Sequence, residues 1–155
     1  YYLDAVKRDG VPYDLITKAL PTIEGEVNNI LSQLVDFQML FEMDGKNINN
    51  YIVYDDDNVW PLELSSGMER FISSLAIRVA LINVSNLPRS NFLAIDEGWG
   101  TMDSDNLNSV YSLFQYLKSQ FQFTLIVSHI DSMRDAVDSL LEIKKENKFS
   151  NVLFD

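Results

Sequence analysis

The sequence predicts an α/β fold in which a parallel sheet is flanked by helices and preceded by a helical segment and a hairpin. Two apolar runs, residues 91–95 and 123–127, each end in polar residues, and a segment with helical apolar spacing separates them. Strand, helix and strand in this order are typical of a parallel pair joined by a crossover helix. Since 155 residues suffice for one compact core, we predict a single domain over residues 1–155.

The first part of the chain predicts helices and then a hairpin. Apolar residues recur at helical spacing from Tyr13 to Leu34, and Pro21 is expected to divide this stretch into two helices. Residues 36–42 and 51–55 predict strands, joined by a polar turn that contains Asp-Gly-Lys-Asn at 44–47. We therefore expect a helical segment over residues 1–35, followed by the α/β lobe over residues 36–155.

Charge and composition limit the classes of partner. The formal net charge is −11, and the longest basic run is the pair Lys144-Lys145, so no broad phosphate-binding face is predicted and any DNA contact is expected mainly through other segments. The chain has no cysteine and no apolar run near the roughly 20 residues that span a bilayer. We expect a soluble intracellular protein of the cytoplasm, nucleus or nucleoid, without a membrane partner.

The first chemical motif is Asp96-Glu97, which directly follows the apolar run 91–95. Acids at the carboxyl edge of a parallel sheet lie where α/β proteins bind ligands, although acids also end strands as simple caps. The arrangement resembles a Walker B motif. This resemblance implies that Asp96 holds Mg²⁺ through water and that Glu97 orients and helps to deprotonate an attacking water.

Two neighbouring features extend this resemblance. Residues 98–103, Gly-Trp-Gly-Thr-Met-Asp, resemble the loop that follows Walker B in ABC ATPases, in which a hydrophobic residue precedes an aspartate, here Asp103. His129 is the only histidine and follows the second apolar run. Its position resembles the switch histidine that contacts the γ-phosphate, whereas a lone histidine without this context is more often a residue satisfied by local hydrogen bonds.

Residues 64–71, Leu-Ser-Ser-Gly-Met-Glu-Arg-Phe, resemble the ABC signature, Leu-Ser-Gly-Gly-Gln or Glu. Ser65 and Gly67 match, Ser66 replaces the first glycine, and Met68 stands where Gln or Glu is usual, with Glu69 displaced by one. A hydroxyl, a glycine and the N–H groups of a helix start make a receptor for a terminal phosphate. The same string also fits a simple helix cap.

The order of these motifs identifies the chain as similar to the C-terminal lobe of an ABC-type ATPase head of the SbcC/SMC DNA-repair group, over residues 60–139. No Gly-x-x-x-x-Gly-Lys-Ser/Thr loop occurs in the sequence. In this family the loop lies in an N-terminal lobe of the same polypeptide, beyond a long coiled coil, so residues 1–35 are expected to enter from that coiled coil. The resemblance implies that the chain alone does not hydrolyse ATP.

The resemblance also implies partners and a process. Asp96, Glu97 and His129 would complete a site whose P-loop comes from the N-terminal lobe. Ser65, Ser66, Gly67 and Asp103 would face nucleotide, with the signature toward ATP bound by a second head. ATP and Mg²⁺ are the implied cofactors, and double-strand-break repair or recombination with an SbcD-type nuclease is the implied function.

Two other functions fit parts of the sequence. A catalytically inactive lobe that docks a partner would explain Ser66 and Met68, but not adjacent acids at a strand end. A metal nuclease using Asp96, Glu97 and Asp103 would need carboxylates from separate elements, whereas these lie in one segment. The run Asp55-Asp56-Asp57-Asn58 predicts a solvated turn, since consecutive acids point in divergent directions.

Overall fold

A computed structural model describes residues 2–7, 10–45, 47–96, 107–146 and 148–154 of the chain. Within these residues, contacts divide the chain into two compact units, Tyr1–Ser90 and Asn91–Asp155, and each is described by itself. The prediction of a single domain stays a prediction.

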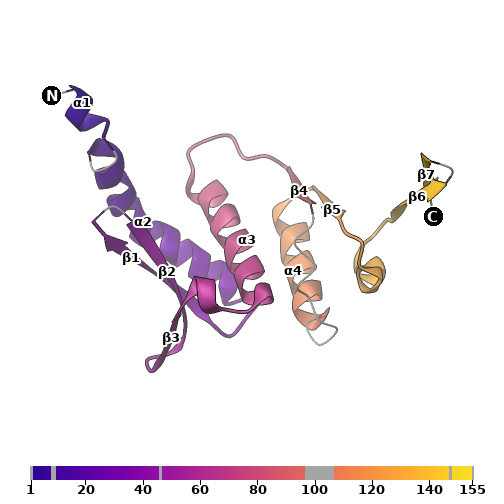
Figure 1. Ribbon diagram of the computed structural model, residues 1–155, viewed down its shortest axis with the longest axis horizontal. Helices are drawn as coiled ribbons and strands as arrows, with labels where there is room; N and C mark the ends of the chain where they lie inside the picture. The colour runs from indigo at the N-terminus through magenta and orange to yellow at the C-terminus, as the bar shows by residue number, and fades with distance from the viewer. Residues whose placement is uncertain (1, 8–9, 46, 97–106, 147, 155) are drawn as a thin grey trace. The chain divides into compact units, whose positions relative to one another are not determined.

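Helices of the first unit are α1 (Tyr2–Ala5), α2 (Val11–Leu31) and α3 (Gly67–Val84), and α2 packs against α3 (Figure 1). The predicted break at Pro21 is wrong, because α2 continues through this residue. A proline within a helix removes one donor, the N–H that would bond to the carbonyl four residues earlier. The remaining turns keep their bonds, and burial of Leu20 and Val27 on either side stabilises one continuous helix.

The predicted hairpin is confirmed. Strand β1 (Gln38–Asp44) pairs antiparallel with β2 (Asn47–Asp55), and Asp44 lies opposite Asn47 at the turn. Gly45 has φ +59° there, a left-handed conformation that glycine adopts without strain. A further strand that we did not predict, β3 (Asn58–Pro61), pairs antiparallel with β2 and makes a three-stranded sheet.

The core of the first unit lies between α2, α3 and the sheet. Asn28 on α2 ties the helix to β1, since its side-chain amide donates to the carbonyl of Met39 at 2.9 Å and accepts from the Met39 N–H at 2.7 Å. Burial of apolar side chains supplies the main driving force. The buried set is Leu20, Val27, Ile30, Leu31, Leu34, Phe37, Met39, Ile52, Met68, Ile72, Leu75, Ala76, Val79 and Ala80.

The second unit contains the predicted parallel pair. Strand β4 (Phe92–Asp96) pairs in parallel with β5 (Phe123–Val127), and α4 (Leu107–Gln120) lies between them in the sequence. The α/β class is therefore confirmed. Alternate side chains of β5 are exposed in this chain. The sheet has two strands here, and α4 contacts only part of it.

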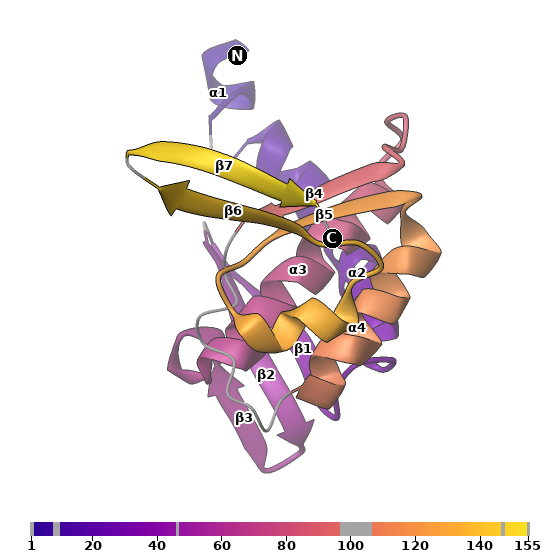
Figure 2. The same cartoon turned by 90° about the vertical axis from the view of Figure 1, so that its right-hand side faces the viewer.

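The chain ends in a 3-10 helix, η3 (Asp131–Ala136), and a second hairpin. Strands β6 (Leu141–Glu146) and β7 (Phe149–Phe154) pair antiparallel, as Figure 2 shows. Lys148 in the turn has φ +69°. Among the described residues, no helix combines the length and apolar character needed to cross a membrane.

Candidate functional site

The turn before α3 is held by Ser65. This residue follows the 3-10 helix η1 (Leu62–Leu64) in an extended conformation. Its N–H and its hydroxyl both donate to the carbonyl of Leu62, at 3.2 and 2.7 Å. Ser65 therefore closes η1 and turns the backbone toward the start of α3.

Ser66 caps α3 through a reciprocal pair of hydrogen bonds with Glu69. The Glu69 N–H donates to the Ser66 hydroxyl at 3.3 Å, and the Ser66 N–H donates to Glu69 Oε2 at 2.6 Å. This capping box explains the displacement of the glutamate by one residue, since only the third helical position lets the carboxylate reach back to the cap. Met68, the other departure, is buried in the core. The cap interpretation of this string is thus confirmed as a structural feature.

The cap leaves two backbone donors at the helix start. The first N–H groups of a helix have no acceptor within the helix. Because the Glu69 N–H is used by the capping box, the N–H groups of Gly67 and Met68 are the ones that could donate to an acceptor outside the helix. Together with the helix dipole they form a local electropositive position suited to a phosphate oxygen.

Tyr54 joins this turn to the sheet, a contact that the sequence did not predict. Its hydroxyl donates to Glu69 Oε1. Partial burial, the hydrogen bond to Glu69 and the charge of that carboxylate raise the pKa of Tyr54 to about 12. Burial acts to raise the pKa of Glu69, but the hydrogen bonds from Tyr54 and Ser66 outweigh it and hold the pKa below its ordinary value. The pair is therefore a neutral phenol and a carboxylate at neutral pH.

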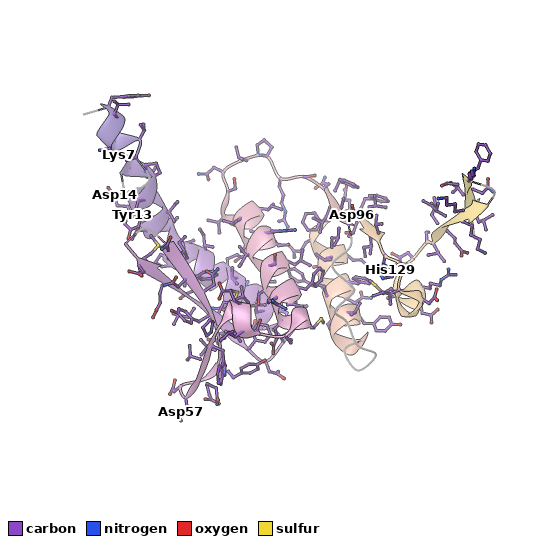
Figure 3. All side chains as sticks on the ribbon, in the orientation of Figure 1. Lys7, Tyr13, Asp14, Asp57, Asp96 and His129 are labelled. Atoms are coloured by element: carbon purple, nitrogen blue, oxygen red, sulfur yellow. The ribbon has the colours of Figure 1, made fainter. Side chains whose placement is uncertain are left out.

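In the second unit, the carboxyl ends of β4 and β5 bring two predicted site residues to one edge. Asp96, the last residue of β4, lies opposite Val127, the last residue of β5, and His129 follows two residues later. Figure 3 labels Asp96 and His129 near this strand pair. Both side chains are exposed. The Ile130 N–H donates to the Ser128 hydroxyl at 3.1 Å, which shapes the backbone around His129.

The acidic run at residues 55–57 forms the turn between β2 and β3. Asp55 accepts from the Asp57 N–H at 3.0 Å and from the Asn58 side chain at 2.7 Å, and these bonds lower its pKa. This carboxylate therefore stabilises its own turn. Among the described residues, no cluster of three or more acidic, histidine or cysteine side chains has the geometry of a metal site.

Comparison with known proteins relates the chain to one group. No protein-family profile matches it. Uncharacterized protein R555 of Acanthamoeba polyphaga mimivirus is 34% identical over 169 residues, which cover 99% of this chain and 12% of that protein. The SbcC subunit of the SbcCD nuclease of Deinococcus radiodurans is 32% identical over 107 residues, or 66% of this chain and 12% of the relative. The chain thus spans about one eighth of these curated relatives.

Solved structures show the same fold. A structure from work on ATP-driven dimerization and DNA-stimulated activation of SMC ATPases superposes with a TM-score of 0.73 at 16% identity, covering 91% of this chain and 88% of that one. The chain is similar to the C-terminal lobe of an SbcC/SMC-type ABC ATPase head. This similarity agrees with the order of the motifs in the sequence.

Within the SbcC/SMC-type lobe, the predicted site residues divide between the two units. Ser65, Ser66 and Gly67 lie at the start of α3, and Asp96 and His129 lie at the edge of β4 and β5. The predicted residues Glu97 and Asp103 lie outside the described residues. The geometry thus brings together three predicted residues at the helix start and two at the strand edge.

Proposed function

We propose that this chain is the C-terminal part of an ATP-hydrolysing head of the SbcC/SMC type, active only when it assembles with a P-loop-bearing N-terminal lobe. The observation that carries the proposal is the parallel pair β4–β5, which ends in Asp96 on one strand and leads to His129 on the other. The similarity to an SbcC protein and to SMC heads supports it.

The sheet of the second unit supports the need for another lobe. Parallel sheets occur almost only with both faces covered. Because side chains alternate along a strand, one face of this pair carries residues that are exposed in this chain: Phe92, Ala94, Phe123, Leu125 and Val127. Phe92 and Phe123 stack on this face with ring centroids 5.5 Å apart. Further strands and helices from an N-terminal lobe would cover it.

The role of Asp96 follows from its place at the end of β4. Asp96 offers a carboxylate to solvent at the carboxyl edge of the sheet, which fits the oxygen donors that magnesium prefers. Magnesium, when bound with ATP, neutralises negative charge on the phosphates. Glu97 would hold and deprotonate the attacking water, and His129 would contact the γ-phosphate from the neighbouring strand.

The turn before α3 would engage the nucleotide of a second head. The N–H groups of Gly67 and Met68 would donate to the γ-phosphate, with the Ser65 hydroxyl beside them. Asp103 would lie near the same head-to-head interface. ATP would then join two heads, and hydrolysis would release them. We place this cycle in double-strand-break repair or recombination, with an SbcD-type nuclease as partner and DNA bound mainly through other segments.

Reassembly with the N-terminal lobe tests the proposal directly. The chain by itself is expected to show no ATP turnover above background, because it has no P-loop. Mixed with a P-loop-bearing N-terminal lobe of the SbcC/SMC type, it should show magnesium-dependent phosphate release. The proposal that this chain supplies only part of the catalytic site would be overturned if the purified chain alone hydrolysed ATP and Glu97→Gln abolished that turnover.

Ser65→Arg is expected to block ATP-driven pairing of assembled heads while sparing ATP binding within each head. The long cation would occupy the position of the opposing γ-phosphate and also break the hydroxyl bond to Leu62. Light scattering with and without ATP measures pairing, and equilibrium binding of labelled ATP measures the head's own site. Unchanged ATP-dependent pairing would remove Ser65 from the interface.

One observation favours a second function, a catalytically inactive interaction lobe. The N–H and hydroxyl of Ser66 are already engaged by Glu69, so this residue has less capacity to bind a phosphate than a signature glycine would. In that case the reassembled head would bind its partner lobe without ATP turnover. The reassembly experiment therefore separates the two functions.

A further inference from the structure

Tyr54 occupies an irregular position in β2. The register between β2 and β3 shifts between Val53 and Asp55, which places Tyr54 in a bulge. Bulges redirect a side chain relative to the regular alternation of a strand. The Tyr54 ring packs edge-on against Phe37, with centroids 5.8 Å apart, and Phe37 is itself buried. One side of the ring therefore contacts the core of the first unit, while the side chain as a whole is 47% exposed.

The hydroxyl end of Tyr54 contacts the cap of α3. It donates to Oε1 of Glu69, and Oε2 of the same carboxylate accepts from the Ser66 N–H at 2.6 Å. One carboxylate thus connects the sheet to the turn that carries Ser65 and Gly67. The contact joins residues 15 positions apart, one on β2 and the other in the first turn of α3.

We propose that Tyr54 is a positioning residue for the turn before α3. Acting through Glu69, it holds Ser66 and the start of α3 in the geometry that the nucleotide of a second head requires. The inference rests on the proposed function. It adds to that function a residue outside the signature segment. Through Tyr54, the three-stranded sheet contributes to the ATP-dependent pairing of two heads.

The physical case depends on what the carboxylate does when Tyr54 is absent. With both oxygens bonded, Glu69 cannot turn away from the helix start, so Ser66 keeps its extended conformation at φ −63° and ψ 161°. The Gly67 and Met68 N–H groups then stay directed outward. Without the phenol, one oxygen loses its donor, and the carboxylate is free to rotate toward the incoming phosphate and repel it.

The experiment compares Tyr54→Phe with Tyr51→Phe in the assembled head. Both remove one hydroxyl from β2, and Tyr51 serves as the matched control. Because one hydrogen bond to a carboxylate is lost, Tyr54→Phe should raise the head concentration for half-maximal ATP-dependent pairing about 3- to 10-fold. ATP binding by the head's own site should not change, since the P-loop lobe holds that nucleotide. Tyr51→Phe should behave like the parent in both measurements.

Glu69 variants supply a rescue test. Glu69→Ala removes both contacts and should weaken pairing at least as much as Tyr54→Phe. Glu69→Gln should restore most of the pairing, because its amide oxygen can accept from the Ser66 N–H while its amide nitrogen donates to the Tyr54 hydroxyl oxygen, so both contacts remain. A loss caused only by reduced stability would lower ATP binding and pairing together, which would overturn the positioning role.

The outcomes separate this inference from the function on which it rests. If Ser65→Arg blocks pairing while Tyr54→Phe pairs like the parent, the proposed function stands and the positioning role of Tyr54 is refuted. If Ser65→Arg also leaves pairing unchanged, the signature role itself fails. The positioning role is supported if Tyr54→Phe weakens pairing selectively and Glu69→Gln pairs better than Glu69→Ala.

Discussion

Glu97→Gln is expected to stop ATP turnover by the assembled head while ATP remains bound. Glutamine keeps the size and much of the hydrogen bonding of the side chain but lacks the carboxylate that accepts a proton from water. Loss of a general base typically lowers a rate by about 10²- to 10⁴-fold. Paired heads should accumulate in the presence of ATP, as measured by phosphate release alongside light scattering.

The adjacent acid provides the control, because its proposed role is different. Asp96→Asn removes a negative charge next to the cation, so magnesium-dependent ATP binding should weaken and paired heads should become scarce. The two variants should therefore fail in opposite ways. If both behave like the parent in binding, hydrolysis and pairing, the interaction-lobe function is favoured instead. If both abolish DNA cleavage by this chain alone, the nuclease function is favoured.

Ile72→Ala is expected to have the largest effect on stability among the changes considered. Ile72 lies on α3, is 1% exposed and belongs to the core that packs α3 against α2. Truncating a buried isoleucine removes apolar burial and leaves a cavity, which costs about 2–5 kcal/mol. Urea unfolding followed by circular dichroism should show a lower midpoint with little change in slope.

Leu81→Ala is the matched control for this prediction. Leu81 lies on the same helix and is 48% exposed, so its truncation should cost much less than that of Ile72. Equal midpoints for the two variants would contradict the assignment of Ile72 to the core. They would also indicate that Ile72 is not part of the packing between α3 and α2.

Local patterns in the sequence were enough to predict most elements of this chain. The first hairpin was predicted from residues 36–42 and 51–55 and the Asp-Gly turn between them, because strand propensity and turn chemistry are properties of a few neighbouring residues. The helix cap within residues 64–71 was predicted for the same reason, since a cap depends on residues within one helical turn. Placing Asp96 at the end of a parallel strand likewise needed only the apolar run before it.

Other features depended on contacts between distant residues. Continuation of α2 through Pro21 follows from the core on either side of it, which local propensity does not report. Strand β3 forms because β2 offers it an edge, and the bond from Tyr54 to Glu69 exists because a bulge in that pairing redirects the ring. The sequence by itself determined the class of fold and which residues are proposed for the chemistry of an ATPase lobe. Only the tertiary structure decided which of them meet, because pairing register and packing are set by the burial of many side chains at once.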